Sequence, residues 1–247
     1  LSHPNTVAVF DFGQTPEGTL YYAMEHLNGV TLEDLVRISG PLPATRVLSI
    51  LDQVCGSLRE AHAQGLIHRD IKPTNIMLCE HGGLHDVVKV LDFGLVKDIQ
   101  QDAPDLTQAN ALVGTPFYLA PELITDATVF SPASDLYALG GVGYYLLTGR
   151  NVFEGTSSVE ICAMHLHDEP VPPSQLTTRK ISTDLEKIVM ACLAKEPADR
   201  PQGAAVMSEM LAQCQDYGAC RQDQAQKWWA DNRGALPMEG HEDNRSP

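Results

Sequence analysis

Apolar positions along this chain change from the spacing of β-strands to the spacing of α-helices. Near the start, two runs of β-branched and aromatic residues, 6–12 and 19–24, are separated by Gly13, Pro16 and Gly18. Runs of this kind on either side of turn-forming residues predict a short β-hairpin. The chain is therefore expected to begin with β structure.

Helical spacing begins soon after the hairpin. Thr31 is suited to the N-cap of a short helix, with Asp34 three residues later and Gly40 at its end. Residues 44–64 then place apolar side chains at helical intervals, and the pattern ends at Gly65. Two consecutive helices are predicted.

The middle of the chain mixes short strands with polar loops, and the rest is helical. Short β-like runs lie at 66–67, 76–78 and 87–91, and residues 95–121 are small and polar with no clear period. Four helices are predicted after this stretch, at 133–148, 156–167, 182–194 and 201–213. A β-rich start followed by a mostly helical body predicts an α+β fold.

Composition narrows the class of partner. The chain has 247 residues and a formal net charge of −15, which argues against nonspecific binding to nucleic acid or to an anionic membrane. No apolar run reaches the roughly 18 residues that a membrane span needs. The six cysteines form no C-x-x-C pair, so reduced thiols and a cytoplasmic location are expected. A longer protein carrying this chain could still have a membrane anchor elsewhere.

Two short motifs bring together residue types suited to phosphoryl transfer. Residues 68–75 read His-Arg-Asp-Ile-Lys-Pro-Thr-Asn, and an Asp-Phe-Gly begins at Asp92, seventeen residues after Asn75. A lone His-Arg-Asp would be weak evidence, because a tripeptide of common residues recurs by chance. The full string followed by Asp-Phe-Gly is much more specific.

Each polar residue of the two motifs has a chemical role in this interpretation. Asp70 can orient an attacking hydroxyl and accept its proton, and Asn75 and Asp92 offer the hard oxygen ligands that Mg²⁺ prefers. Lys72 adds positive charge where a transferring phosphate builds negative charge. Asp and Asn also favour turns, so each alone could be an ordinary loop cap. Their type, order and spacing together favour catalysis.

The motif pair resembles the catalytic and metal-binding loops of protein kinases. Residues 114–122, Gly-Thr-Pro-Phe-Tyr-Leu-Ala-Pro-Glu, resemble the end of the activation segment, where a protein substrate docks. The string 86–97 is similar to eukaryotic-like Ser/Thr kinases of bacteria. Since the resemblance extends to about residue 213, it implies a kinase-like fold, with a partial small β-rich N-lobe from about strand four and a complete, mostly helical C-lobe.

The resemblance also implies a nucleotide site that takes ATP and Mg²⁺, with Mn²⁺ as an alternative metal. Met24 matches the gatekeeper position, and Glu25 and Leu27 match the hinge that binds adenine through backbone groups. Met77 matches the apolar residue beneath the adenine ring, and Asp92 the residue that reaches the phosphates through the metal. Without the neighbouring motifs, plain core packing would be the better interpretation of both methionines.

Several other residues match structural supports of the family. His68 is expected to stack on Phe93 behind the site and not to act as an acid or base. Glu122 is expected to pair with Arg200, because an isolated buried carboxylate is costly. Asp135 matches a buried aspartate that braces the catalytic loop.

The irregular stretch offers two threonines of interest. Thr107 lies where related bacterial kinases autophosphorylate, which would involve self-association, and a phosphate there could order the loop near Arg69. A solvated loop threonine is the competing interpretation. Thr115 is expected to bond Asp70 and Lys72, an arrangement associated with Ser/Thr substrates.

The elements that grip ATP phosphates in the family are missing from this chain. No Gly-x-Gly-x-x-Gly precedes residue 25, and neither the strand lysine nor its partner glutamate is present. The expected division is 1–27 as a remnant of N-lobe and hinge, 28–214 as C-lobe, and 215–247 as tail or linker. The hairpin should then have exposed strand edges.

Three functions fit this pattern. A truncated protein Ser/Thr kinase is favoured because Asp70, Lys72, Asn75 and Asp92 are all intact, although the chain itself should be weakly active or inactive. A pseudokinase acting as a binding module or signalling scaffold is the alternative. A small-molecule kinase is disfavoured by the docking segment 114–122.

Two further motifs have no assigned role in this interpretation. Trp228-Trp229 is compatible with a partner-docking patch or with a packed accessory helix. His165-x-His167 lacks a third metal ligand and is expected to be a surface polar pair.

Overall fold

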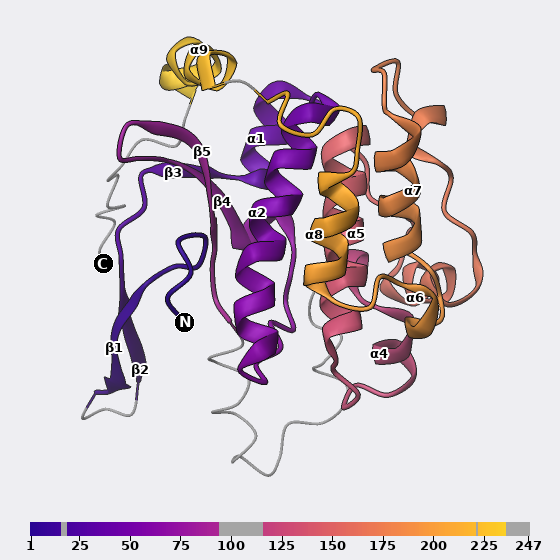
Figure 1. Cartoon of the computed structure of the whole chain (residues 1–247). Helices are drawn as coiled ribbons and strands as arrows, with labels where there is room; N and C mark the ends of the chain where they lie inside the picture. The colour runs from indigo at the N-terminus through magenta and orange to yellow at the C-terminus, as the bar shows by residue number, and fades with distance from the viewer. Residues whose placement is uncertain (16–18, 94–115, 221, 236–247) are drawn as a thin grey trace.

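The computed structural model describes residues 1–15, 19–93, 116–220 and 222–235 (Figure 1). Its strands are β1 Val9–Gln14, β2 Leu20–Met24, β3 Gly29–Thr31, β4 Ile76–His81 and β5 Leu84–Val90. Its helices are α1 Leu32–Ser39, α2 Ala44–Ala63, α4 Pro121–Thr125, α5 Pro132–Thr148, α6 Ser158–His167, α7 Thr183–Cys192, α8 Ala204–Ala212 and α9 Gln222–Asn232. The strands and α9 gather on one side of the molecule and the other helices on the opposite side, as expected for the α+β class.

The predicted hairpin is confirmed as the antiparallel pair β1–β2. Among the described strands, neither of the two pairs with a third. This agrees with the expected open edges, and Phe10 and Phe12, which share one face of the hairpin, are 71% and 76% exposed. The base of the hairpin is tied to β5, because Val7 donates to Val90 and Val90 donates to Asn5 through backbone bonds of 3.0 and 2.8 Å.

A second antiparallel sheet has the order β3–β4–β5. Its first strand was not predicted, because three residues give too short a pattern. Gly29 lies so close to β4 that a Cβ there would be 2.4 Å from the carbonyl oxygen of Leu78. The strand expected at 66–67 is wrong: Leu66 donates its backbone N–H to Ala61 at 2.9 Å, so this segment caps the end of α2.

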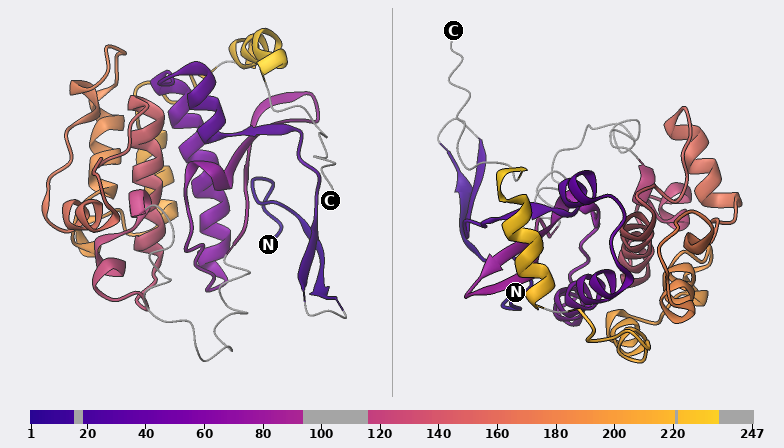
Figure 2. Two further views of the ribbon diagram at one scale, coloured as in Figure 1. Left: turned by 180° about the vertical axis from the view of Figure 1, so that it is seen from behind. Right: turned by 90° about the horizontal axis from the view of Figure 1, so that it is seen from above.

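The predicted helices are confirmed, with ends shifted by a few residues. Thr31 is the N-cap of α1, and its side chain accepts the backbone N–H of Asp34 at 3.0 Å. Helix α2 contacts α8 and α5, and α5 in turn contacts α7. Figure 2 shows these helices side by side, with the strands and α9 at the opposite end of the molecule. The fully buried apolar face of α2 comprises Val47, Ile50, Leu51, Val54 and Leu58.

The tryptophan pair belongs to a packed accessory helix. Trp229 of α9 is 1% exposed, and its Nε1 donates to Oδ1 of Asp86 on β5 at 2.9 Å. Asp86 also accepts both Nε and Nη2 of Arg46, at 2.7 and 2.8 Å. Trp228 lies over the Arg46 guanidinium and donates to Ser39 of α1 at 2.8 Å. Through its two tryptophans, α9 therefore contacts α1, α2 and β5.

The surface interpretation of the histidine pair is wrong for one of its members. His167 is exposed, but His165 is fully buried, and its Nδ1 lies 2.7 Å from the Tyr137 hydroxyl. Desolvation lowers the pKa of His165 to about 4, so its ring is neutral at physiological pH. The described residues contain no cluster of three or more His, Cys, Asp or Glu side chains that would hold a metal.

All six cysteines are free thiols, and burial raises the pKa of Cys55 well above its ordinary value. Among the described helices, none combines the length and apolarity that crossing a bilayer requires.

Candidate active site

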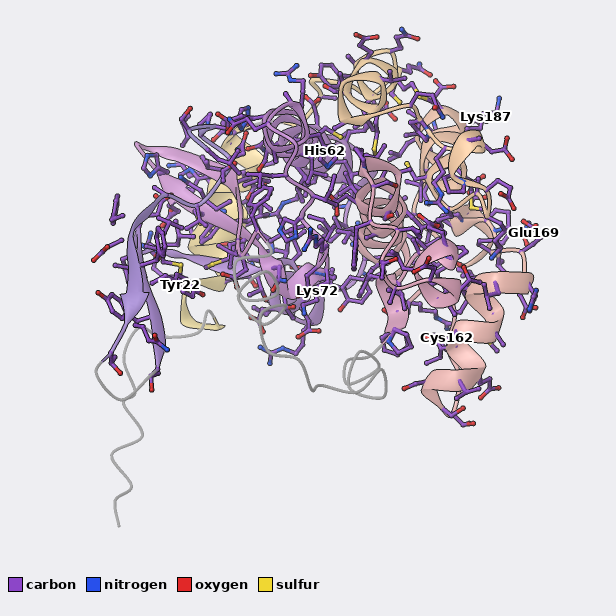
Figure 3. All side chains as sticks on the ribbon, turned by 90° about the horizontal axis from the view of Figure 1, so that it is seen from below. Tyr22, His62, Lys72, Cys162, Glu169 and Lys187 are labelled. Carbon is purple, nitrogen blue, oxygen red and sulfur yellow. The ribbon has the colours of Figure 1, made fainter. Side chains whose placement is uncertain are left out.

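The three residues expected to be catalytic lie together on the loop between α2 and β4. Lys72 Nζ is 2.8 Å from Asp70 Oδ2, and Asn75 Nδ2 donates to the same oxygen at 2.9 Å. Asn75 also donates to the Asp70 carbonyl at 2.9 Å, and the 3-10 turn Pro73–Asn75 brings it back to this position. The Lys72 and Asp70 side chains are 39% and 41% exposed, so a substrate hydroxyl can reach them. In Figure 3, Lys72 marks this loop seen from below.

The second loop is attached directly to the first. The backbone N–H of Leu91 donates to the Asn75 carbonyl at 2.9 Å, and Asp92 follows with a positive φ of 52°. Few residues other than glycine adopt this left-handed conformation readily, and Asp is among them. The turn leaves Asp92 exposed, and its Oδ1 accepts the Tyr22 hydroxyl at 3.0 Å.

His68 joins the two loops from behind, as expected. Its side chain is fully buried, and the ring centroid is 4.6 Å from that of Phe93. Its Nε2 lies 2.7 Å from the Leu91 carbonyl, and therefore carries the proton and donates. Burial lowers the pKa of His68, which favours the neutral ring.

Asp135 of α5 supports the catalytic loop through hydrogen bonds to its backbone. Its Oδ2 accepts the His68 backbone N–H at 2.8 Å and lies 2.8 Å from His62 Nε2, while Oδ1 accepts the Arg69 N–H at 3.0 Å. Arg69 has a positive φ of 68°, an uncommon conformation for a bulky residue. The Asp135 carboxylate holds the backbone in this turn, which confirms the expected support.

Glu122 and Arg200 form the expected ion pair. Arg200 Nη1 and Nη2 donate to Oε1 and Oε2 of Glu122 at 2.8 and 2.7 Å. Burial raises the pKa of Glu122, but the Arg200 hydrogen bonds outweigh this and hold it below its ordinary value. The pair fixes α4, in whose first turn the docking segment 114–122 ends, to the loop before α8.

Of the residues expected around adenine, Glu25 and Leu27 lie on the connection between β2 and β3, and the two methionines lie on strands. Met24 ends β2 and is 43% exposed, Leu27 is half-buried, and Met77 is half-buried on β4. Glu25 donates its backbone N–H to Ala8 at 2.8 Å, so its carbonyl is the backbone group left for a ligand.

Sequence reasoning missed two partners of these residues. The Glu25 carboxylate bonds Lys89 Nζ at 2.7 Å, and the Tyr22 hydroxyl bonds Asp92. The alternation along 19–24 puts Tyr22 on the same face of the strand as Met24, which is the one local signal that could have indicated the second contact.

The oxygen atoms present fit a divalent metal bound together with a nucleotide. Asn75 uses Nδ2 toward Asp70, which leaves its amide oxygen as a ligand atom. Asp92 accepts Tyr22 through Oδ1, which leaves Oδ2. Mg²⁺ is commonly bound by one or two protein side chains plus substrate phosphates, so two oxygen ligands are enough.

Some predictions fall outside the described residues. Thr107 and Thr115 both lie between residues 94 and 115, so the expected phosphorylation and the expected bonds to Asp70 and Lys72 stay predictions.

The chain matches the protein kinase domain family over residues 1–213, and it belongs to that family. It is 40% identical over 239 residues to the Serine/threonine-protein kinase pkn3 of Myxococcus xanthus, covering 96% of this chain and 43% of that protein. It is 41% identical over 210 residues to the Serine/threonine-protein kinase PknB of Mycobacterium tuberculosis, covering 84% of this chain and 33% of the relative. The resemblance to bacterial Ser/Thr kinases is thereby confirmed.

The fold comparison agrees. A crystal structure of Rad53 1-466 in complex with AMP-PNP superimposes with a TM-score of 0.70 at 26% identity, covering 85% of this chain and 51% of that one. The expected kinase-like fold is confirmed. The chain spans less than half the length of the two curated relatives named above.

Proposed function

We propose that this chain carries the catalytic part of an ATP-dependent protein Ser/Thr kinase, which transfers the γ-phosphoryl group to Ser or Thr hydroxyls of protein substrates. The observation that carries the proposal is the convergence of Lys72 and Asn75 on one oxygen of Asp70. The names of the relatives support the Ser/Thr class.

Asp70 positions the substrate hydroxyl and accepts its proton as the phosphoryl group is transferred. Lys72, 2.8 Å from Asp70, stabilises the negative charge on the transferring group. Asn75 and Asp92 would hold Mg²⁺, or Mn²⁺ in its place. When bound, the metal neutralises charge on the ATP phosphates.

The nucleotide base lies between the two sheets in this proposal. Met24 and Met77 supply apolar contacts to the ring, and the backbone of Glu25 and Leu27 supplies hydrogen bonds. Two groups of Glu25 already have partners within the protein: its backbone N–H donates to Ala8, and its carboxylate accepts from Lys89. Its backbone carbonyl is the group that would accept a hydrogen bond from the base.

Protein substrates would dock on the segment that leads into α4, and self-association would serve phosphorylation at Thr107. The acidic net charge of −15 leaves nucleic acid out of the proposed partners. The cytoplasmic location expected from the cysteine pattern stays a prediction.

The proposal is tested by incubating the chain in excess with γ-labelled ATP, Mg²⁺ and a generic protein substrate, then identifying the labelled amino acid. Transfer to Ser and Thr is expected, at rates well below the roughly 1–100 s⁻¹ typical of kinases, because the glycine-rich loop and strand lysine are not in this sequence. Labelled tyrosine alone would contradict the Ser/Thr assignment. Nucleotide binding with no transfer, in a longer protein that also carries a glycine-rich loop and strand lysine, would favour the pseudokinase.

A further inference from the structure

One hydrogen bond connects the β1–β2 hairpin to the proposed metal ligand. The Tyr22 hydroxyl, on β2, donates to Oδ1 of Asp92 at 3.0 Å. The two residues are 70 positions apart in the sequence. Figure 3, seen from below, labels Tyr22 on the hairpin and Lys72 on the catalytic loop.

The backbone around Asp92 is already fixed without Tyr22. His68 lies 2.7 Å from the Leu91 carbonyl on one side of Asp92 and packs against the Phe93 ring on the other. These contacts hold the peptide units but do not reach the carboxylate. An exposed aspartate side chain without a partner can turn about its own bonds, so the position of the ligand oxygens depends on what bonds them.

The geometry of the Tyr22 contact leaves the carboxylate able to bind a cation. A carboxylate has two oxygens, and the phenol occupies Oδ1. The neutral hydroxyl donates its hydrogen to the carboxylate and adds no positive charge beside the metal ligand. Hydrogen bonds of this kind orient metal ligands and raise metal affinity.

We propose that Tyr22 is a positioning residue for Asp92: its hydroxyl fixes the carboxylate with Oδ2 directed toward the metal. This inference rests on the proposed function, in which Asp92 is a metal ligand. It also gives the hairpin a role at the site, because movement of β2 would change the orientation of the ligand.

A competing arrangement predicts the opposite result. If the hydroxyl blocked the carboxylate, removing it would strengthen metal binding. If the hydroxyl orients the carboxylate, removing it weakens metal binding. Loss of other groups that orient metal ligands lowers metal affinity by about 10–100-fold, and a similar loss is expected here.

The test is a Mn²⁺ titration of the chain in the presence of AMP-PNP, which supplies the nucleotide phosphates, followed by water-proton relaxation, with Tyr22→Phe. Tyr21→Phe is the matched control, since it makes the same chemical change one residue away, where the Tyr21 ring lies over Gly13. Asp92→Asn defines the signal without the site, and Tyr22→Phe in that background should have no further effect.

We expect Tyr22→Phe to raise the Mn²⁺ dissociation constant by at least about tenfold and Tyr21→Phe to leave it unchanged. Unchanged or tighter binding in Tyr22→Phe, with native binding still dependent on Asp92, would overturn the inference and leave the proposed function standing. Equal Mn²⁺ binding by the native chain and Asp92→Asn would remove the metal site itself, and with it both proposals.

Discussion

The Arg200 guanidinium donates two hydrogen bonds, of 2.7 and 2.8 Å, to the Glu122 carboxylate, and the Arg200 side chain is fully buried. Arg200 also donates to the carbonyls of Ala133, Ala194 and Lys195. One guanidinium therefore joins α4, the start of α5 and the segment after α7.

Glu122→Gln should destabilise the chain by about 3–5 kcal/mol, because it leaves the buried Arg200 charge without its counter-ion. Urea unfolding followed by circular dichroism measures the change. Glu209→Gln, at an exposed position of α8, is the control and should stay within about 0.5 kcal/mol of the native chain. Equal stability of the two variants would contradict the importance assigned to the pair.

The same pair predicts how stability depends on pH. The pKa of Glu122 in the folded chain lies below its ordinary value of 4.5, so the unfolded chain binds the proton first as pH falls. The contribution of the pair is therefore fully present above about pH 4.5 and is lost as pH falls through the folded pKa. Unfolding free energies measured from pH 6 downward should fall less steeply in Glu122→Gln than in the native chain. Parallel curves would be evidence against this source of acid sensitivity.

Trp229→Ala should destabilise the chain by about 3–5 kcal/mol, the range for deleting a buried tryptophan. The change also leaves Asp86 with one donor fewer, beside Arg46. Lys227→Ala, an exposed change on the same helix, is the control. Chemical denaturation compares the two; a small effect of Trp229→Ala would mean that α9 is a loosely attached tail.

The catalytic and metal residues could be predicted from sequence because their chemistry is encoded locally. Asp70, Lys72 and Asn75 lie within six consecutive residues, and a short loop with a 3-10 turn is enough to bring them together. The helices were predictable for a related reason, since periodic apolar positions such as those of α2 specify which face is buried.

Contacts between distant segments could not be predicted in the same way. Nothing near Trp229 in the sequence shows that Asp86 will accept its N–H, and nothing near His165 shows that Tyr137 will bury it. The Tyr22–Asp92 bond likewise depends on how the hairpin packs on the rest of the chain. A strand as short as β3 is fixed by its partner strand and not by its own pattern.

The matches to known proteins differ in whether they include α9. The family match ends at residue 213, before α9, whereas the match to the Myxococcus xanthus protein covers 96% of the chain, which includes most of this helix. The division of the chain at residue 215 stays a prediction, although α9 packs firmly on β5 in the structure.

The most direct test of the central proposal is single-turnover phosphoryl transfer by the native chain and by Asp70→Asn, with ATP affinity measured on both. The change keeps the size of the side chain and removes its ability to accept a proton. We predict that the rate falls by orders of magnitude while ATP affinity changes little, because Asp70 acts on the substrate hydroxyl and not on the nucleotide. Equal and measurable transfer rates in the two chains would contradict the assignment of Asp70 as the catalytic base.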